Sequence, residues 1–118
     1  MVVRLRTNTD EVAKYKELTP GNYYRVIEVS YSRSYRVMND TGSPYLYEAH
    51  LFEVMSDTYP SDWITEYDDQ GGVSYMGPKC LSEPGFFEKY FEGDDKARLT
   101  LRKRLGYWIT GEDYLVNK

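Results

Sequence analysis

The residue types that most often carry enzyme chemistry are scarce, since the 118 residues include one histidine and one cysteine. To act as a general base, His50 needs a partner within hydrogen-bond reach, and only Glu48 and Glu53 lie near it in sequence. Lys79 could activate the neighbouring Cys80, but a lone cysteine before an aromatic segment is more typical of a small buried hydrophobe. A structural zinc ion needs about four ligands. We therefore expect no catalytic residue, no metal site and no cofactor.

Asp62, Glu66, Asp68 and Asp69 form an acidic cluster beside aromatic residues. Residues 59–93 contain two lysines against seven acids, a local charge of −5. The acids follow neither the calcium-loop pattern nor a spacing that would place two carboxylates across a sugar, and the simplest interpretation is a solvated hairpin tip. The functional interpretation is a docking surface, because aromatic anchors among charged residues are typical of protein interfaces. Its candidate partner-binding residues are Asp62, Trp63, Glu66, Tyr67, Asp68, Asp69 and Tyr75.

Arginines interleaved with tyrosines give an alternative of another class, a small barrel that binds single-stranded nucleic acid. Tyrosines would stack on bases and arginines would contact phosphates. The net charge of −4 argues against it, since phosphate repels an acidic chain. A second basic stretch, residues 96–104, is most simply the wet face of an amphipathic helix. The residues of the nucleic-acid alternative are Tyr23, Tyr24, Arg25, Tyr31, Arg33, Tyr35 and Arg36.

These residues are expected to lie on one folded domain, residues 1–118. Hydrophobic residues make up 41% of the chain and aromatic residues 16%, including thirteen tyrosines. No apolar run has the length of a membrane helix or a signal-peptide core, and a lone cysteine forms no internal disulfide. The sequence therefore predicts a cytoplasmic protein. Exposed strand edges would also allow a homodimer.

The first half of the chain predicts a meander of short strands. Aromatic and β-branched residues dominate the segments that precede and follow the turn Asn39–Gly42. A short helix is expected over Thr9–Glu17, with Thr9 or Asp10 as its cap. The predicted strands are Val2–Arg6, Tyr23–Tyr31, Tyr35–Met38, Pro44–Tyr47 and Leu51–Met55.

The second half predicts a hairpin and two helices. Trp63–Tyr67 and Val73–Met76 flank the turn sequence Asp-Asp-Gln-Gly-Gly. A helix is expected from Ser82 to Gly93, with four aromatic residues at helical spacing that seal a core. A second helix opens at Asp94 and ends at Gly106. Its apolar stripe is Ala97, Leu101, Leu105 and Trp108, and Trp108–Val116 could add a last strand.

Two segments carry a resemblance. Thr19–Met55 resembles the small bacterial SH3-like barrels. The resemblance rests on a Pro-Gly entry, a Tyr-Arg-Val strand, a polar-Gly turn and a Leu-Phe-Glu-Val strand. It lacks the acidic, aromatic peptide-groove motif of eukaryotic SH3 domains, so polyproline binding is not implied. Pro84–Ala97 is similar to the helical tails of small bacterial immunity-type proteins, acidic single domains that neutralise a toxin. Neither resemblance implies a catalytic residue.

The sequence as a whole predicts an α+β fold: a small, SH3-like, strongly bent antiparallel sheet over residues 19–55, a second hairpin over 63–76 and a helical tail over 82–106. The expected function is non-catalytic binding of another protein, of immunity or antitoxin type in a bacterium or phage. The acidic aromatic surface would attract a basic partner and block it.

Overall fold

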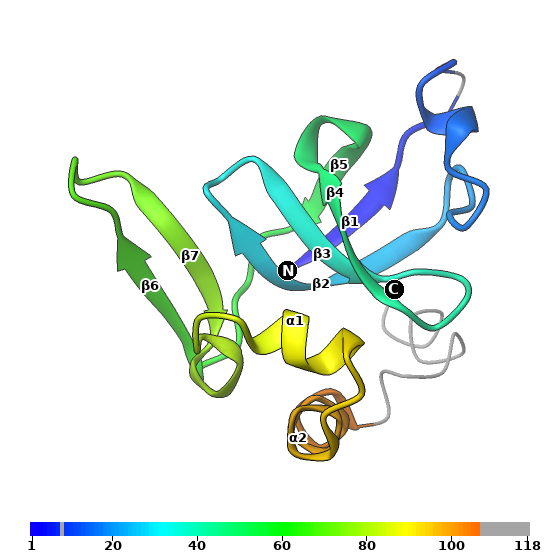
Figure 1. The fold of residues 1–118 in the computed structure, drawn as a ribbon. Helices are drawn as coiled ribbons and strands as arrows, with labels where there is room; N and C mark the ends of the chain where they lie inside the picture. Colours follow the sequence, from blue (N-terminus) through cyan, green and yellow to red (C-terminus); the bar gives the residue numbers. More distant parts are fainter. Residues whose placement is uncertain (8, 107–118) are drawn as a thin grey trace.

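The computed structural model describes residues 1–7 and 9–106 of the chain (Figure 1). Over these residues it is an α+β structure in which seven antiparallel strands form a bent, unclosed sheet and two helices follow. The strands are β1 (Val2–Leu5), β2 (Tyr23–Ser30), β3 (Ser34–Met38), β4 (Pro44–Glu48), β5 (Phe52–Ser56), β6 (Trp63–Tyr67) and β7 (Val73–Pro78). The helices are α1 (Phe86–Phe91) and α2 (Asp95–Leu105), and short 3-10 turns occupy η1 (Val12–Lys14), η2 (Ala49–Leu51) and η3 (Lys79–Leu81).

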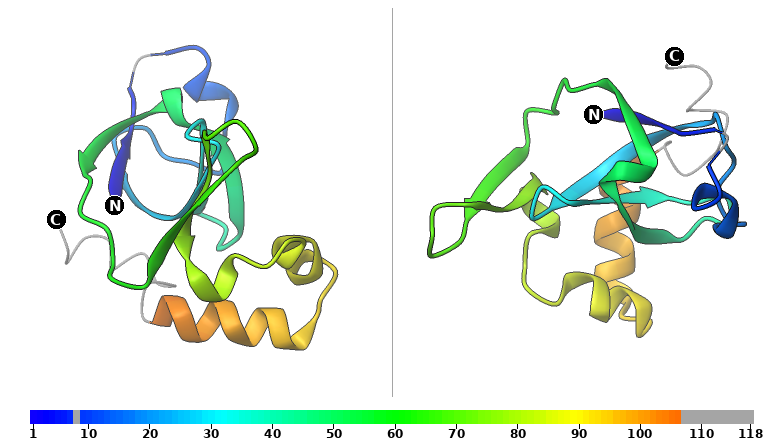
Figure 2. Two further views of the ribbon diagram at one scale, coloured as in Figure 1. Left: turned by 90° about the vertical axis from the view of Figure 1, so that its left-hand side faces the viewer. Right: turned by 90° about the horizontal axis from the view of Figure 1, so that it is seen from above.

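The central strand, β2, organises the sheet. One edge pairs with β3, which pairs in turn with β4. The other edge is shared, because β1 pairs with residues 23–25 of β2 and β7 pairs with residues 29–30. The register with β3 shifts between Val26 and Glu28, and such a bulge bends a strand and strengthens its twist. Because of this bend, the β6–β7 hairpin projects away from the rest of the sheet (Figures 1 and 2).

The bulge also divides the core between the two faces of the sheet. Val26 and Val29 belong to a first buried cluster with residues of β1, β3, β5 and the segment around η1. Ile27 belongs to a second cluster that lies between the sheet and the two helices. Glu28, the next residue, pairs with Arg36, whose guanidinium lies over the Phe87 ring of α1, and it is therefore also directed to the helical side.

The predicted strands are confirmed with shifts of one or two residues at their ends, but the predicted helix over Thr9–Glu17 is wrong. Only the 3-10 turn η1 forms there, although the Thr9 hydroxyl does accept from the Val12 N–H. Val12, Tyr15 and Leu18 stand three residues apart, and their backbone bonds join residues three apart. Burial against the first cluster therefore favours successive tight turns over an α-helix.

The two helices differ in how well the sequence predicted them. α1 begins at Phe86 and not at Ser82, because Gly85 has a left-handed φ of 79° and Ser82 Oγ donates to the Lys79 carbonyl of η3. α2 follows the prediction: Asp94 Oδ1 accepts from the Ala97 N–H at 2.8 Å, and Gly106 ends the helix. Ala97, Leu101 and Leu105 are buried, whereas Trp108 and the predicted strand at 108–116 lie outside the described residues. No helix in the described ranges has the length and apolarity needed to cross a membrane.

The β2–β3 turn holds two non-glycine residues in the left-handed region. Tyr31 has φ 51° and Ser32 has φ 57°, and the Arg33 N–H donates to the Ser30 carbonyl at 3.0 Å. Two-residue turns of this kind favour Asn followed by Gly, because both positions need positive φ.

Replacing Ser32 with glycine should therefore stabilise the protein by about 1 kcal/mol, since glycine adopts positive φ without a steric penalty. Urea unfolding of Ser32→Gly and of Ser43→Gly, a serine without positive φ, measures the effect. A Ser32→Gly protein no more stable than the wild type would contradict the strained turn.

Candidate functional site

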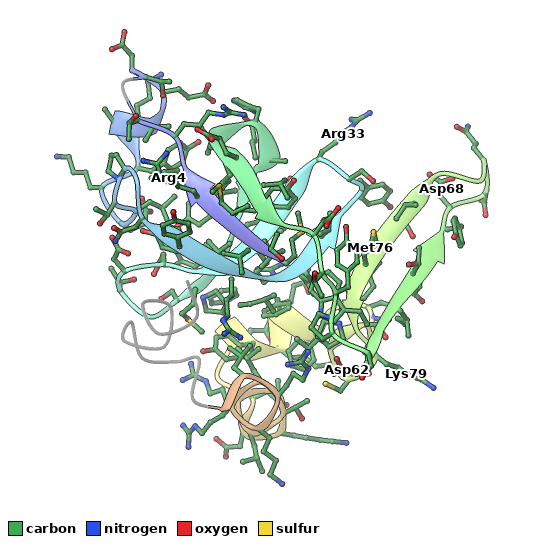
Figure 3. All side chains as sticks on the ribbon, turned by 180° about the vertical axis from the view of Figure 1, so that it is seen from behind. Arg4, Arg33, Asp62, Asp68, Met76 and Lys79 are labelled. Atoms are coloured by element: carbon green, nitrogen blue, oxygen red, sulfur yellow. The ribbon has the colours of Figure 1, made fainter. Side chains whose placement is uncertain are left out.

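The β6–β7 hairpin projects from the body of the molecule and carries the acidic aromatic segment predicted for docking (Figure 3). Asp68 lies at its tip, and Asp62 lies at its base beside Lys79. Because directly opposed residues share a face, Glu66 lies beside Tyr75 on one face and Thr65 lies beside Met76 on the other. The second face packs on the first core cluster through Trp63 and Met76.

Two of the predicted acids are occupied by structural contacts. Asp62 accepts two hydrogen bonds from the Arg104 guanidinium, at 2.5 and 2.8 Å, which fasten the base of the hairpin to the end of α2. Asp68 Oδ1 accepts from the backbone N–H groups of Gln70 and Gly72, both at 2.9 Å, and so closes the hairpin turn. Asp62 and Asp68 therefore shape the hairpin, and neither carboxylate is a clean probe of partner binding.

Two of the predicted aromatic anchors are half-buried. The Trp63 ring lies 5.3 Å from the Tyr59 ring, centroid to centroid, and packs against the first core cluster. The Tyr75 hydroxyl donates to the Pro78 carbonyl at 2.9 Å. Burial, followed by the nearby Glu28 carboxylate, raises the pKa of Tyr75 well above its usual range. Both rings hold the hairpin on the sheet and offer a partner only part of their surface.

The remaining predicted residues, Glu66, Tyr67 and Asp69, are exposed. Tyr67 is 66% exposed, and neither acid forms an ion pair with another residue in the described ranges. Tyr31 adjoins strand β7 of the same hairpin, because its N–H donates to the Ser74 carbonyl at 3.1 Å, and it is 59% exposed. We call Tyr31, Glu66, Tyr67 and Asp69 the hairpin surface.

The sequence had placed Tyr31 in the nucleic-acid alternative and not with the acidic segment. The pairing of β2 with β7, a strand much later in the chain, joins it to the hairpin. No local sequence signal marks that pairing, although the bend of β2 makes it possible.

The residues of the nucleic-acid alternative do not form one exposed face. Tyr24 is 3% exposed, so the expectation that it stacks on bases is wrong; its hydroxyl accepts from the Thr19 N–H and donates to Asp40. Arg36 is held in a buried ion pair, and among the three arginines only Arg33 is exposed. The half-buried members of the set are Tyr23, Arg25 and Tyr35.

The buried ion pair lies between the sheet and α1. Arg36 Nε donates to Glu28 Oε2 at 2.9 Å, and Arg36 also donates to the Pro44 carbonyl at 2.8 Å. Its guanidinium carbon lies 3.8 Å from the centre of the Phe87 ring. Burial raises the pKa of Glu28 above its ordinary value of 4.5 despite the opposing effect of Arg36. The pair is a structural contact, which removes Arg36 from any role in phosphate binding.

The raised pKa of Glu28 predicts a specific pH dependence of stability. The folded state binds the Glu28 proton more tightly than the unfolded chain does, so wild type gains stability relative to Glu28→Gln as pH falls through the folded pKa towards 4.5. Urea unfolding of both proteins across that range measures the difference. A difference in unfolding free energy that stays constant with pH, or that grows in the opposite direction, would contradict the raised pKa.

His50 has acquired a partner that its sequence neighbours did not reveal. Its Nε2 lies 2.8 Å from both carboxylate oxygens of Glu11, and its Nδ1 lies 3.5 Å from Glu48. Glu53 instead lies 3.9 Å from Arg4 and Arg6. One possible ligand atom from each of Glu11, Glu48 and His50 lies within 4.8 Å of the other two. These three side chains are exposed or half-buried, and they supply fewer than the about four ligands of a structural zinc ion. This arrangement is that of a surface charge cluster linking η1 to η2.

Cys80 is exposed, so the expectation of a buried cysteine is wrong. Partial burial raises the pKa of its thiol, although Arg104 acts in the opposite direction. A thiol is a weaker nucleophile than a thiolate, and this environment does not favour the thiolate.

Comparison of the chain with protein-family models, with curated proteins and with solved structures finds no match. The resemblances to SH3-like barrels and to immunity-type proteins therefore stay predictions. The function has to be argued from the geometry of the hairpin surface.

Proposed function

We propose that this chain is a non-catalytic protein-binding module, of immunity or antitoxin type, whose hairpin surface docks on a basic surface of its partner. The observation that carries the proposal is the position of Tyr67 and Tyr31. Among the large apolar side chains that the structure describes, these two are the most exposed, at 66% and 59%, and both lie at the acidic hairpin.

The composition of the hairpin surface suits protein recognition. Tyrosine supplies a large contact area at low cost in conformational entropy and is enriched in interfaces. The exposed carboxylates of Glu66 and Asp69 would attract a basic partner and accelerate encounter. The left-handed backbone at Tyr31 adds support, because strained backbone is found preferentially at functional positions.

The alternative of single-stranded nucleic-acid binding has weaker support in the geometry. Only Tyr31 and Arg33 of its seven residues are exposed. The neighbouring carboxylates of the hairpin would repel a phosphate backbone. We therefore place protein binding first and make nucleic-acid binding an outcome of the test.

Affinity capture from lysate, with and without nuclease treatment and at low and high salt, tests the proposal with three baits: wild type, Tyr67→Ala and Tyr45→Ala. Tyr45 is a matched control because it is 44% exposed and belongs to β4, away from the hairpin. We expect one stoichiometric, basic protein that wild type and Tyr45→Ala retain at low salt and that Tyr67→Ala and high salt release. Capture that Tyr67→Ala leaves unchanged would contradict the hairpin surface. Recovery of nucleic acid, lost on nuclease treatment, would support the alternative instead.

A further inference from the structure

A pocket of about 190 Å³ opens on the helical side of the sheet, between the β3–β4 turn, α1 and α2. The two helices pack against each other on this side (Figure 2). The pocket shares no residue with the hairpin surface. The proposed function therefore does not involve this pocket.

Apolar side chains form part of the wall of this pocket. Met38, Leu101 and Leu105 line it and belong to the second buried cluster, with exposed fractions of 6%, 2% and 3%. Tyr90, which packs on the same cluster, adds an aromatic wall. A ligand that enters the pocket would therefore bring an apolar group against apolar side chains.

The rim of the pocket carries two positive charges on one face of α2. Arg98 and Arg102 both line the pocket and stand four residues apart, so their side chains are neighbours on the helix surface. Neither forms an ion pair with any residue in the described ranges, in contrast to Arg104 and Arg36.

The Arg98 guanidinium is held at the pocket by an aromatic contact, because its central carbon lies 5.3 Å from the centroid of the Tyr90 ring. Like charges four residues apart on a helix repel each other. An anion between Arg98 and Arg102 would relieve that repulsion and accept charge-assisted hydrogen bonds from both.

We propose that this pocket binds a small organic anion, with a carboxylate or phosphate head between Arg98 and Arg102 and an apolar body against Met38, Leu101 and Leu105. The body is about the size of one aromatic ring, since an apolar cavity of about 150 Å³ accepts benzene. The two arginines select for a negatively charged head, and the apolar side chains select for an apolar body. A ligand therefore needs both parts to bind.

NMR titration with phenyl phosphate tests the site, with the Met38 methyl group and the Gly42 amide as reporters. Inorganic phosphate supplies the head without the body, and benzyl alcohol supplies the body without the charge. We expect phenyl phosphate to bind at least about tenfold more tightly than either control, because the two contributions add. Sodium benzoate should bind as phenyl phosphate does if a carboxylate head suffices.

Variants of α2 distinguish binding in this pocket from a general electrostatic attraction of anions to a basic helix. Arg98→Gln and Arg102→Gln should each weaken phenyl phosphate by about tenfold, the value of one charge-assisted hydrogen bond. Lys103→Gln removes the same charge from the same turn of the helix but does not line the pocket, and it should bind like wild type. Equal losses in all three variants, tight binding of inorganic phosphate alone, or no shift of the reporters at millimolar phenyl phosphate would each overturn the proposal.

Discussion

Replacing Arg36 with alanine should lower the free energy of unfolding by about 3–5 kcal/mol, because it leaves the Glu28 carboxylate buried without its partner. Glu28 is 6% exposed and receives its hydrogen bond from Arg36 at 2.9 Å. The substitution also removes the hydrogen bond to the Pro44 carbonyl and the contact with the Phe87 ring. Urea unfolding at neutral pH measures the loss.

Two further variants identify the cause of that loss. Arg36→Lys keeps the charge but not the planar fork that bonds Glu28 and Pro44 together, so it should still destabilise the protein. Replacing both partners, Glu28→Gln with Arg36→Met, removes the unpaired charge and should recover most of the stability. A double variant as unstable as Arg36→Ala would show that the cost arises from packing and not from an uncompensated charge.

Replacing Gly77 with alanine should also destabilise the protein strongly, by about 1–3 kcal/mol, because the site has no room for a methyl group. A Cβ at Gly77 would lie 2.8 Å from the Cβ of Glu28 and 2.7 Å from the Tyr75 hydroxyl oxygen. The Glu28 Cβ is fixed close to the β2 backbone and cannot move aside easily. Strand β7 would have to separate from β2 where the hairpin joins the sheet.

Thermal unfolding of Gly77→Ala measures this effect, with Ser74→Ala as the control in the same strand. Ser74 is half-buried, and its contact with Tyr31 uses only the backbone carbonyl, so its substitution should change the unfolding free energy little. If Gly77→Ala unfolds at the same temperature as Ser74→Ala, then β7 does not approach β2 as closely as the structure has it.

The fold was predictable where local pattern and tertiary burial agree. A high content of aromatic and β-branched residues predicted β2 and β3, and the acid at Asp94 with the glycine at 106 predicted both ends of α2. The pattern failed where tertiary burial decided the backbone. Val12 and its neighbours form tight turns against the core, although their residue types suit a helix.

The candidate site was predictable as a segment but not residue by residue. The acidic aromatic hairpin lies where the turn sequence indicated. Sequence alone did not reveal that Asp62 bonds Arg104, forty-two residues later, or that Asp68 closes the hairpin turn. Both roles depend on contacts in space, and the same is true of Tyr31, which reaches the hairpin only through the bend in β2.

The association rate with the captured partner tests the central claim most directly. Glu66→Lys with Asp69→Lys reverses the two acidic charges of the hairpin surface, and Asp10→Lys with Glu92→Lys reverses two exposed acids elsewhere. At low salt we expect the hairpin variant to associate at least about tenfold more slowly than wild type, with the difference shrinking as salt is added. The control variant should slow association far less. Equal rates for the two variants, or a hairpin variant as fast as wild type, would contradict docking through the acidic hairpin.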